Sequence, residues 1–154
     1  MADVKMIFHD LVRLETELWN AVDARLQAEH DLKLSWFEFM QLMARYQGCR
    51  VYDIKEELSI TIGGTSKLVD RIEAAGLCRR RANPDDGRSQ IIELTPAGRR
   101  LLTKAVKTVD DELEDRLTAG LTARALDQFA STLDKLRAAN RRSASADEAV
   151  PSAS

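Results

Sequence analysis

The fold of this chain is decided by residues 67–98, which read KLVDRIEAAGLCRRRANPDDGRSQIIELTPAG. In the first part of this stretch, up to residue 75, the apolar side chains recur at helical spacing. Gly76 then suits the left-handed conformation that commonly ends a helix. The sequence therefore predicts a helix that ends at this glycine and gives way to a different kind of structure.

The second part of the stretch predicts a two-stranded hairpin, because its apolar side chains alternate. Residues 77–82 form the expected first strand, and residues 83–87, Asn-Pro-Asp-Asp-Gly, have the composition of a turn. The returning strand is expected to place Gln90, Ile92 and Leu94 on its inward side.

Upstream of this stretch, two short helices separated by a tight turn are predicted. Residues 53–58 form the first helix, and Thr61 is expected to cap the second. Three side chains of the second helix share one face and are expected in the core: Thr65, Leu68 and Ile72. The other face is small and polar in its first turn and carries Ile62, Gly63, Gly64, Ser66, Lys67, Asp70 and Arg71. The two helices and the hairpin together predict a winged helix-turn-helix.

Longer helices are predicted on both sides of this unit. Residues 4–26 are apolar on more than one face, which indicates two packing partners, and the second of these is expected to be another copy of the chain. Ser35 and Glu38 have the spacing of a capping box at the start of the next helix. Thr95, followed by proline, and Thr122 are expected to cap the last two helices.

We therefore expect a mainly α-helical fold with a small β wing. The winged helix-turn-helix covers about residues 34–95, and dimerisation helices flank it at about residues 1–30 and 96–140. All of these parts are expected to form one domain, residues 1–140. Residues 141–154 are rich in Ala and Ser, have no apolar periodicity and are expected to be a disordered tail.

The charge of the chain is unevenly distributed, although its net value is only −2. Residues 1–66 carry seven basic and eleven acidic side chains, residues 67–107 carry ten and five, and residues 108–154 carry six and nine. A basic middle between acidic flanks is expected where only the middle faces a polyanion. The alternative is a charged surface that only faces solvent.

Other classes of protein find little support in the sequence. The cysteines and histidines have no metal-ligand spacing, and neither a glycine-rich phosphate loop nor a nucleophile elbow is present, so we expect no metal, no cofactor and no enzymatic activity. No segment has the character of a signal peptide or a membrane span. A cytoplasmic protein is therefore expected.

In the order of its elements and in its motifs, the chain resembles the multiple antibiotic resistance regulator (MarR) family from residue 4 to about residue 140. The motifs are KLVDRIEAAGL at residues 67–77, NPDDGRS at residues 83–89 and LTPAG at residues 94–98. The resemblance implies a homodimeric transcription regulator that binds a palindromic operator in double-stranded DNA. It also implies repression, and release from DNA by a small-molecule effector that is often an aromatic or phenolic anion.

The resemblance implies that the second short helix lies in the major groove of DNA. It also implies that Arg88, at the wing tip, enters the adjacent minor groove. Asp86 would orient the wing. Two glycines at the start of the helix allow close approach to phosphate, and a guanidinium suits the narrow minor groove. Asp70 is expected to pair with an arginine of the chain, because a carboxylate is repelled by phosphate. The residues expected to contact DNA are Thr61, Ile62, Gly63, Gly64, Ser66, Lys67, Arg71, Arg80, Arg81 and Arg88.

Three points stay open in the sequence. The arginines at 79–81 either hold phosphates or form a solvated strand edge, and Arg79 and Arg81 share one side. An effector pocket would draw on His9, Arg13, Trp19 and Trp36, although the tryptophans equally suit a core or a dimer interface. A redox-responsive regulator using Cys49 or Cys78, or a winged helix that binds only proteins, are the alternative functions.

Overall fold

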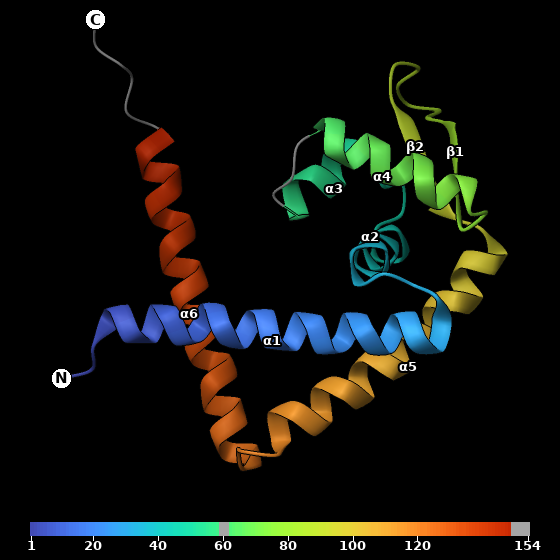
Figure 1. Ribbon diagram of the computed structural model, residues 1–154. Coiled ribbons are helices and arrows are strands. Elements are labelled where there is room, and N and C mark those ends of the chain that lie inside the picture. Colours follow the sequence, from blue (N-terminus) through green and yellow to red (C-terminus); the bar gives the residue numbers. More distant parts are fainter. Residues whose placement is uncertain (59–61, 149–154) are drawn as a thin grey trace, which may run out of the picture. The chain divides into compact units, whose positions relative to one another are not determined.

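The computed structural model describes residues 1–58 and 62–148, and within them the side chains of residues 1–55 and 64–143 (Figure 1). The described residues form six helices and a two-stranded antiparallel sheet. In chain order these are α1 (Val4–His30), α2 (Leu34–Arg45), α3 (Val51–Leu58), α4 (Ile62–Ala74), β1 (Cys78–Ala82), β2 (Gln90–Leu94), α5 (Pro96–Thr118) and α6 (Ala123–Glu148). The predicted mainly helical fold with a β wing is confirmed.

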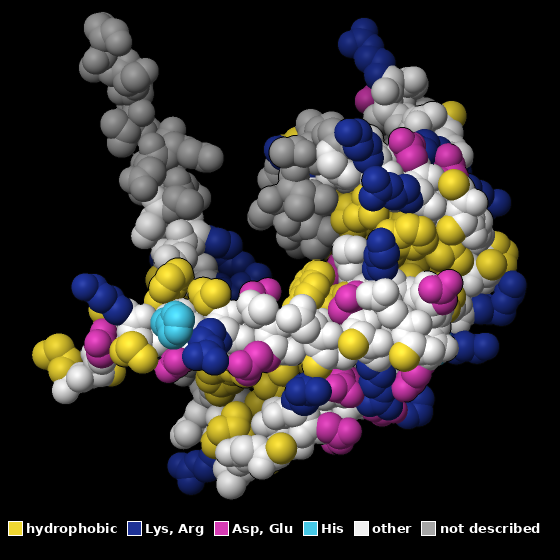
Figure 2. Space-filling view, viewed as in Figure 1, with side chains coloured by type: hydrophobic (Ala, Val, Ile, Leu, Met, Phe, Trp, Pro, Cys, Tyr) yellow, Lys and Arg dark blue, Asp and Glu magenta, His cyan; other side chains and the backbone are white. Residues whose placement is uncertain are grey.

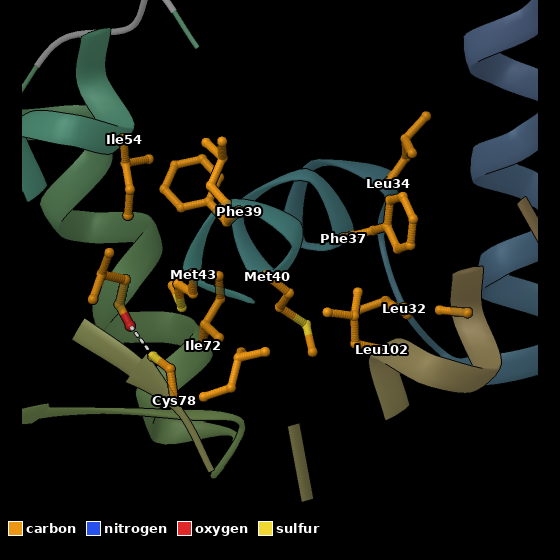
Figure 3. Close-up of a cluster of buried hydrophobic side chains, with 14 of the residues drawn as sticks. Leu32, Leu34, Phe37, Phe39, Met40, Met43, Ile54, Ile72, Cys78 and Leu102 are labelled. Atoms are coloured by element: carbon orange, nitrogen blue, oxygen red, sulfur yellow. Dashed lines mark hydrogen bonds between the residues drawn. The ribbon is translucent and has the colours of Figure 1, made fainter. Parts of the chain in front are cut away.

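The chain divides into two compact units, residues 1–113 and residues 114–154. The first contains the winged helix-turn-helix, and its core surrounds α2, whose apolar face meets side chains from the neighbouring elements (Figure 3). Phe37 and Met40 of α2, Ile54 of α3 and Ile72 of α4 are all at most 2% exposed. Thr65, predicted for the core, is fully buried. Burial of these side chains is the main force that holds α2, α3 and α4 together.

The hairpin is antiparallel, with register from Cys78 opposite Leu94 to Ala82 opposite Gln90. Its burial differs from the prediction, because Gln90 is exposed whereas Ile91 and Ile92 are both buried. The physical reason is a neighbour on the other edge: the amide of Ile92 donates to the carbonyl of Cys49 at 2.7 Å. The segment at Cys49 therefore runs along the second edge of β2, and the side chain of Ile91 lies near Gly48 of this segment, so the simple alternation of buried and exposed side chains fails.

The start of α2 also differs from the prediction. Its N-cap is Lys33, which makes no side-chain capping bond, so the capping box at Ser35 and Glu38 is wrong. The amide of Leu34 donates instead to Oδ1 of Asp23, 2.9 Å away on α1. A carboxylate from another helix thus satisfies the free amide that a local cap was expected to satisfy.

The end of α4 is joined closely to the start of α5. Gly76 has φ 76°, as predicted for a left-handed helix end. Oγ1 of Thr95 donates to the carbonyl of Gly76 at 2.6 Å and accepts from the amide of Gly98 at 3.0 Å, which confirms this threonine as a cap. A Cβ on Gly98 would lie 2.0 Å from the carbonyl oxygen of Leu77. Only glycine fits here, so the end of α4 and the first turn of α5 are held against each other.

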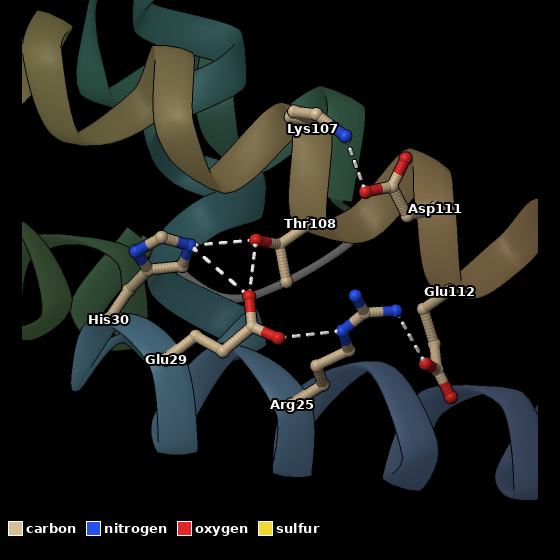
Figure 4. A network of polar contacts seen from close by, with 7 residues as sticks. All are labelled: Arg25, Glu29, His30, Lys107, Thr108, Asp111 and Glu112. Atoms are coloured by element: carbon tan, nitrogen blue, oxygen red, sulfur yellow. Dashed lines mark hydrogen bonds and ion pairs between the residues drawn. The ribbon is translucent and has the colours of Figure 1, made fainter.

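A polar network joins the end of α1 to α5 within the first unit (Figure 4). Arg25 donates to Glu29 at 2.9 Å and to Glu112 at 3.0 Å. The hydroxyl of Thr108 lies 2.9 Å from Oε2 of Glu29 and 2.7 Å from Nε2 of His30. Since the single hydroxyl proton goes to the carboxylate, Nε2 of His30 is the donor to Thr108.

The second unit consists mainly of α6, whose start was predicted correctly and whose end was not. Thr122 caps α6, as predicted, by accepting from the amide of Ala125 at 3.2 Å. The helix continues to Glu148, so the predicted disordered tail is corrected for residues 141–148, while residues 149–154 lie outside the described part. Alanine favours the helix here, and no glycine or proline interrupts it before residue 151.

Among the described residues, no helix combines the length and apolar character that crossing a membrane requires.

Candidate nucleic-acid interface

The three consecutive arginines of β1 all bind carboxylates of the chain. Arg80 donates from Nη2 to Asp70 at 2.6 Å and from Nη1 to Glu73 at 3.0 Å, and its amide also donates to Glu73 at 3.0 Å. The predicted pairing of Asp70 with an arginine is therefore confirmed. Arg80, predicted as a DNA contact, holds β1 against α4 with a side chain that is only 20% exposed.

The other two arginines share one carboxylate on the opposite strand. Nε of Arg79 lies 2.8 Å from Oε1 of Glu93, and Nε of Arg81 lies 3.3 Å from Oε2. Both arginines are therefore on one side of the strand, as predicted. The hydrogen bond from Arg79 is the main cause that lowers the pKa of Glu93, with a smaller contribution from Arg81. These arginines stabilise the hairpin, and Arg81 remains half exposed at its surface.

Three other cations have no such partner. Lys67 and Arg71 are exposed on α4, and Arg88 is exposed at the tip of the hairpin. Within the part of the chain that the structure describes, none of their side chains forms a hydrogen bond or an ion pair. Figure 2 shows basic side chains over α4 and at the hairpin tip. An exposed cation without a carboxylate is available to an external anion, whereas a paired one must first give up its partner.

Side chains of the turn organise the tip that presents Arg88. Oδ1 of Asp86 accepts from the amide of Arg88 at 3.0 Å, and Oδ1 of Asn83 accepts from the amide of Asp85 at 3.0 Å. Nδ2 of Asn83 also donates to Ser89 at 3.0 Å. Asp86 thus contacts the backbone of Arg88 and leaves its guanidinium group unpaired. This geometry supports the prediction that Asp86 orients the wing.

The start of α4 is described only in part. Thr61, its predicted cap, lies outside the described residues, as do the side chain of Ile62 and the surroundings of Gly63. Gly64 is exposed and Ser66 is half-buried on the helix that follows. Together with Lys67 and Arg71, they form an exposed surface at which the backbone can approach a ligand closely.

The residues predicted for an effector pocket are spread over α1 and α2. His9, Arg13 and Trp19 are exposed on α1, and ten residues of helix separate the first from the last by about 15 Å. Trp36 packs against the core from α2. None of the four lines a cavity of about 410 Å³ that lies between the end of α2 and the base of the hairpin. No sequence pattern predicts this cavity, because its walls come from segments that are far apart in the chain.

Neither cysteine has the character of a redox sensor. Cys49 and Cys78 are at most 2% exposed. Burial raises the pKa of each thiol to about 11, and nearby carboxylates, Asp53 and Glu73 respectively, add to the shift. Because the reactive form is the exposed thiolate, the structure offers no support for the redox alternative.

The comparisons with known proteins agree with this geometry. Residues 32–90 match the model of the MarR family. The multiple antibiotic resistance protein MarR of Salmonella typhimurium is 31% identical over 80 residues, which are 51% of this chain and 56% of that protein. MarR of Escherichia coli K12 is 31% identical over 71 residues, 46% of this chain and 49% of that protein. The chain therefore spans about half the length of the curated relatives it matches.

Solved structures extend the likeness over most of the chain. The transcriptional repressor CouR, bound to a 23-mer DNA duplex, is 28% identical with a TM-score of 0.79, over 87% of this chain and 94% of CouR. AbsC of Streptomyces coelicolor has a TM-score of 0.81 at 18% identity, over 92% and 97% of the two chains, and shows the shared fold alone. With the winged helix-turn-helix described above, these matches confirm the predicted family: the chain carries a MarR family domain.

Proposed function

We propose that this protein is a sequence-specific regulator of transcription that binds double-stranded DNA as a homodimer. The observation that carries the proposal is the division of its cations. The arginines at 79–81 bind carboxylates of the chain, whereas Lys67, Arg71 and Arg88 remain exposed and unpaired. The unpaired cations lie on the second short helix and on the wing, the two elements of a winged helix-turn-helix that meet DNA.

In this proposal α4 enters the major groove and Arg88 enters the adjacent minor groove. An α-helix with its side chains is about 10–12 Å in diameter, which suits a major groove about 12 Å wide. Ser66 and Lys67 contact base edges or phosphates, and Arg71 contacts the backbone. CouR was solved with a DNA duplex and an Escherichia coli MarR variant with operator DNA, which supports this assignment.

The homodimer is supported by two apolar surfaces that the chain leaves uncovered. Val4, Phe8 and Val12 of α1 are 75%, 69% and 46% exposed. In the second unit, none of the described side chains, residues 114–143, is buried, although α6 has an apolar stripe. Helices of this kind are stabilised by packing against another chain. A two-fold dimer would recognise an imperfect palindrome with half-site centres about one helical turn apart.

The regulatory outcome in this proposal is repression that a small-molecule effector relieves, with the dimer in the cytoplasm and on the nucleoid when bound. The direct test is binding of the purified chain to duplexes from its own promoter region, measured by fluorescence anisotropy over a range of salt concentrations. Neutralisation of several phosphates should make the affinity fall steeply with salt. Absent or salt-insensitive binding would favour the alternative of a winged helix that binds only proteins.

A further inference from the structure

The side chain of Arg80 joins β1 to two carboxylates of α4. Its Nη2 donates to Asp70 at 2.6 Å and its Nη1 donates to Glu73 at 3.0 Å. The backbone amide of the same residue donates to the other carboxylate oxygen of Glu73 at 3.0 Å. Glu73 therefore holds Arg80 by both its backbone and its side chain, and this leaves the second arm of the guanidinium group directed at Asp70.

Asp70 also lies beside a cation of its own helix. It follows Lys67 by three residues, and residues three or four positions apart are neighbours on the surface of a helix. The two side chains thus have the spacing of an ion pair, yet Asp70 bonds to Arg80 instead. Glu73 lacks such a neighbour, because Val69 and Asp70 occupy the positions four and three residues before it, and Gly76 and Leu77 those after it.

The competition for Asp70 favours the arginine. The side chain of Arg80 is 20% exposed, so its ion pair is less screened by water than one with the exposed Lys67. The planar guanidinium group binds two carboxylates at once, whereas an ammonium group on a flexible chain must be ordered for each bond. Asp70 is therefore withheld from Lys67 as long as Arg80 is in place.

We propose that Arg80 is a positioning residue that keeps Lys67 available to DNA by binding Asp70. Without the guanidinium group, the carboxylate of Asp70 turns to Lys67, offsets its charge and repels the phosphates that Lys67 would contact. The consequence for DNA deepens the proposed function and rests on it. The competing explanations are a direct phosphate contact by Arg80 and an ion pair that only stabilises the fold.

A rescue experiment separates these explanations, with anisotropy of the full chain on promoter duplexes at low salt. Arg80→Gln should weaken binding about threefold or more, since an ion pair must open and a carboxylate faces phosphate. Adding Asp70→Asn should restore the affinity, whereas adding Glu73→Gln, which removes an equal charge, should recover less than about twofold. Equal recovery by the two, or none by Asp70→Asn, would overturn the proposal.

A second background tests whether Arg80 acts through Lys67. In Lys67→Ala, the further change Arg80→Gln should cost less than about twofold, because the cation that Asp70 would capture is gone. A direct phosphate contact would cost the same factor in both backgrounds and would contradict the proposal. Arg100→Gln, an exposed arginine of α5, is the control for loss of one positive charge and should leave the affinity within about twofold of wild type.

Two measurements do not depend on the folding of Arg80→Gln or on DNA. Asp70→Asn alone should change the affinity less than about twofold, because Arg80 already holds that carboxylate, and a threefold gain would overturn the proposal. In the free chain, the ¹⁵Nζ resonance of Lys67, followed by NMR, should shift in Arg80→Gln and return when Asp70→Asn is added. No such shift would overturn the proposal. That shift together with no DNA binding by the wild type would sink the proposed function and leave the relation of Arg80, Asp70 and Lys67 standing.

Discussion

The two units of the chain differ most in what they bury. Among the side chains that the structure describes, all of the buried ones lie at or before Val109, whereas residues 114–143 contain none. The first unit therefore has a core of its own, and its helices are held by packing, by the Thr95 junction and by the Thr108 network. The second unit has helical propensity and an apolar stripe but no core. The difference indicates that the first unit can fold alone, while the second depends on another chain for its stability.

Gly98→Ala should have the largest effect on stability, because it places a methyl group where the backbones of Gly98 and Leu77 are in close contact. The new Cβ would lie 2.0 Å from the carbonyl oxygen of Leu77, so the backbone itself must shift. We expect a loss of about 3 kcal/mol in the free energy of unfolding, measured with urea. Gly120→Ala is the control, since a Cβ there meets nothing within 4 Å. Equal effects of the two variants would contradict the close packing of α4 against α5.

Phe129→Asp should weaken the association of the second unit with a partner chain and leave the first unit folded. Phe129 is half-buried on α6, and Gln128 beside it is exposed, so Gln128→Asp adds the same charge outside the stripe. We expect the dissociation constant of the dimer to rise at least about tenfold in Phe129→Asp, because the dimer would have to desolvate a charged carboxylate. Light scattering at micromolar concentration gives the mass of each protein. A monomeric wild type would refute the comparison outright.

Thr108→Val should weaken the junction between α1 and α5 by a smaller amount. The change removes the hydroxyl that donates to Glu29 and accepts from His30, and leaves both of them short of a partner. We expect a cost of about 1–2 kcal/mol, again from urea unfolding. Thr103→Val is the matched control, because the exposed Thr103 hydroxyl bonds only to the backbone of its own helix. A cost no greater than that of the control would show that the network contributes nothing.

Acidification should have the smallest of these effects on stability, through protonation of Glu29. The pKa of Glu29 is lowered, mainly by its hydrogen bond from Arg25 and then by the one from Thr108. A lowered pKa in the folded state stabilises the protein above the ordinary value of 4.5, and this contribution is lost as the pH falls below that value. The urea midpoint of the wild type should therefore fall more between pH 6 and pH 3.5 than that of Glu29→Gln. Parallel falls would contradict the ion pair.

Much of the fold could be predicted from local patterns. The hairpin, the left-handed end at Gly76 and the caps at Thr95 and Thr122 depend on neighbouring residues, and each is confirmed. Pairing of Asp70 with an arginine followed from charge alone. These features share one property: the residues that decide them are close in the sequence, or their chemistry leaves one kind of partner.

The predictions that were wrong depend on distant segments. Asp23 replaces the cap expected from Ser35, and the segment at Cys49 covers β2 so that Ile91 is buried. The cavity, which no pattern predicted, has walls from α2, the hairpin and α5. Such contacts arise only when the core assembles, so the spacing of residues cannot reveal them.

The central claim is that unpaired cations of α4 and the wing bind DNA, whereas paired ones hold the fold. It is tested most directly by the salt dependence of promoter binding for the wild type, Arg88→Ala and Lys135→Ala, the last on the exposed surface of α6. The account predicts that Arg88→Ala weakens binding about tenfold and lowers the slope of log affinity against log salt by about one, at unchanged unfolding temperature. Lys135→Ala should leave both unchanged. Wild-type affinity and slope in Arg88→Ala would contradict the account.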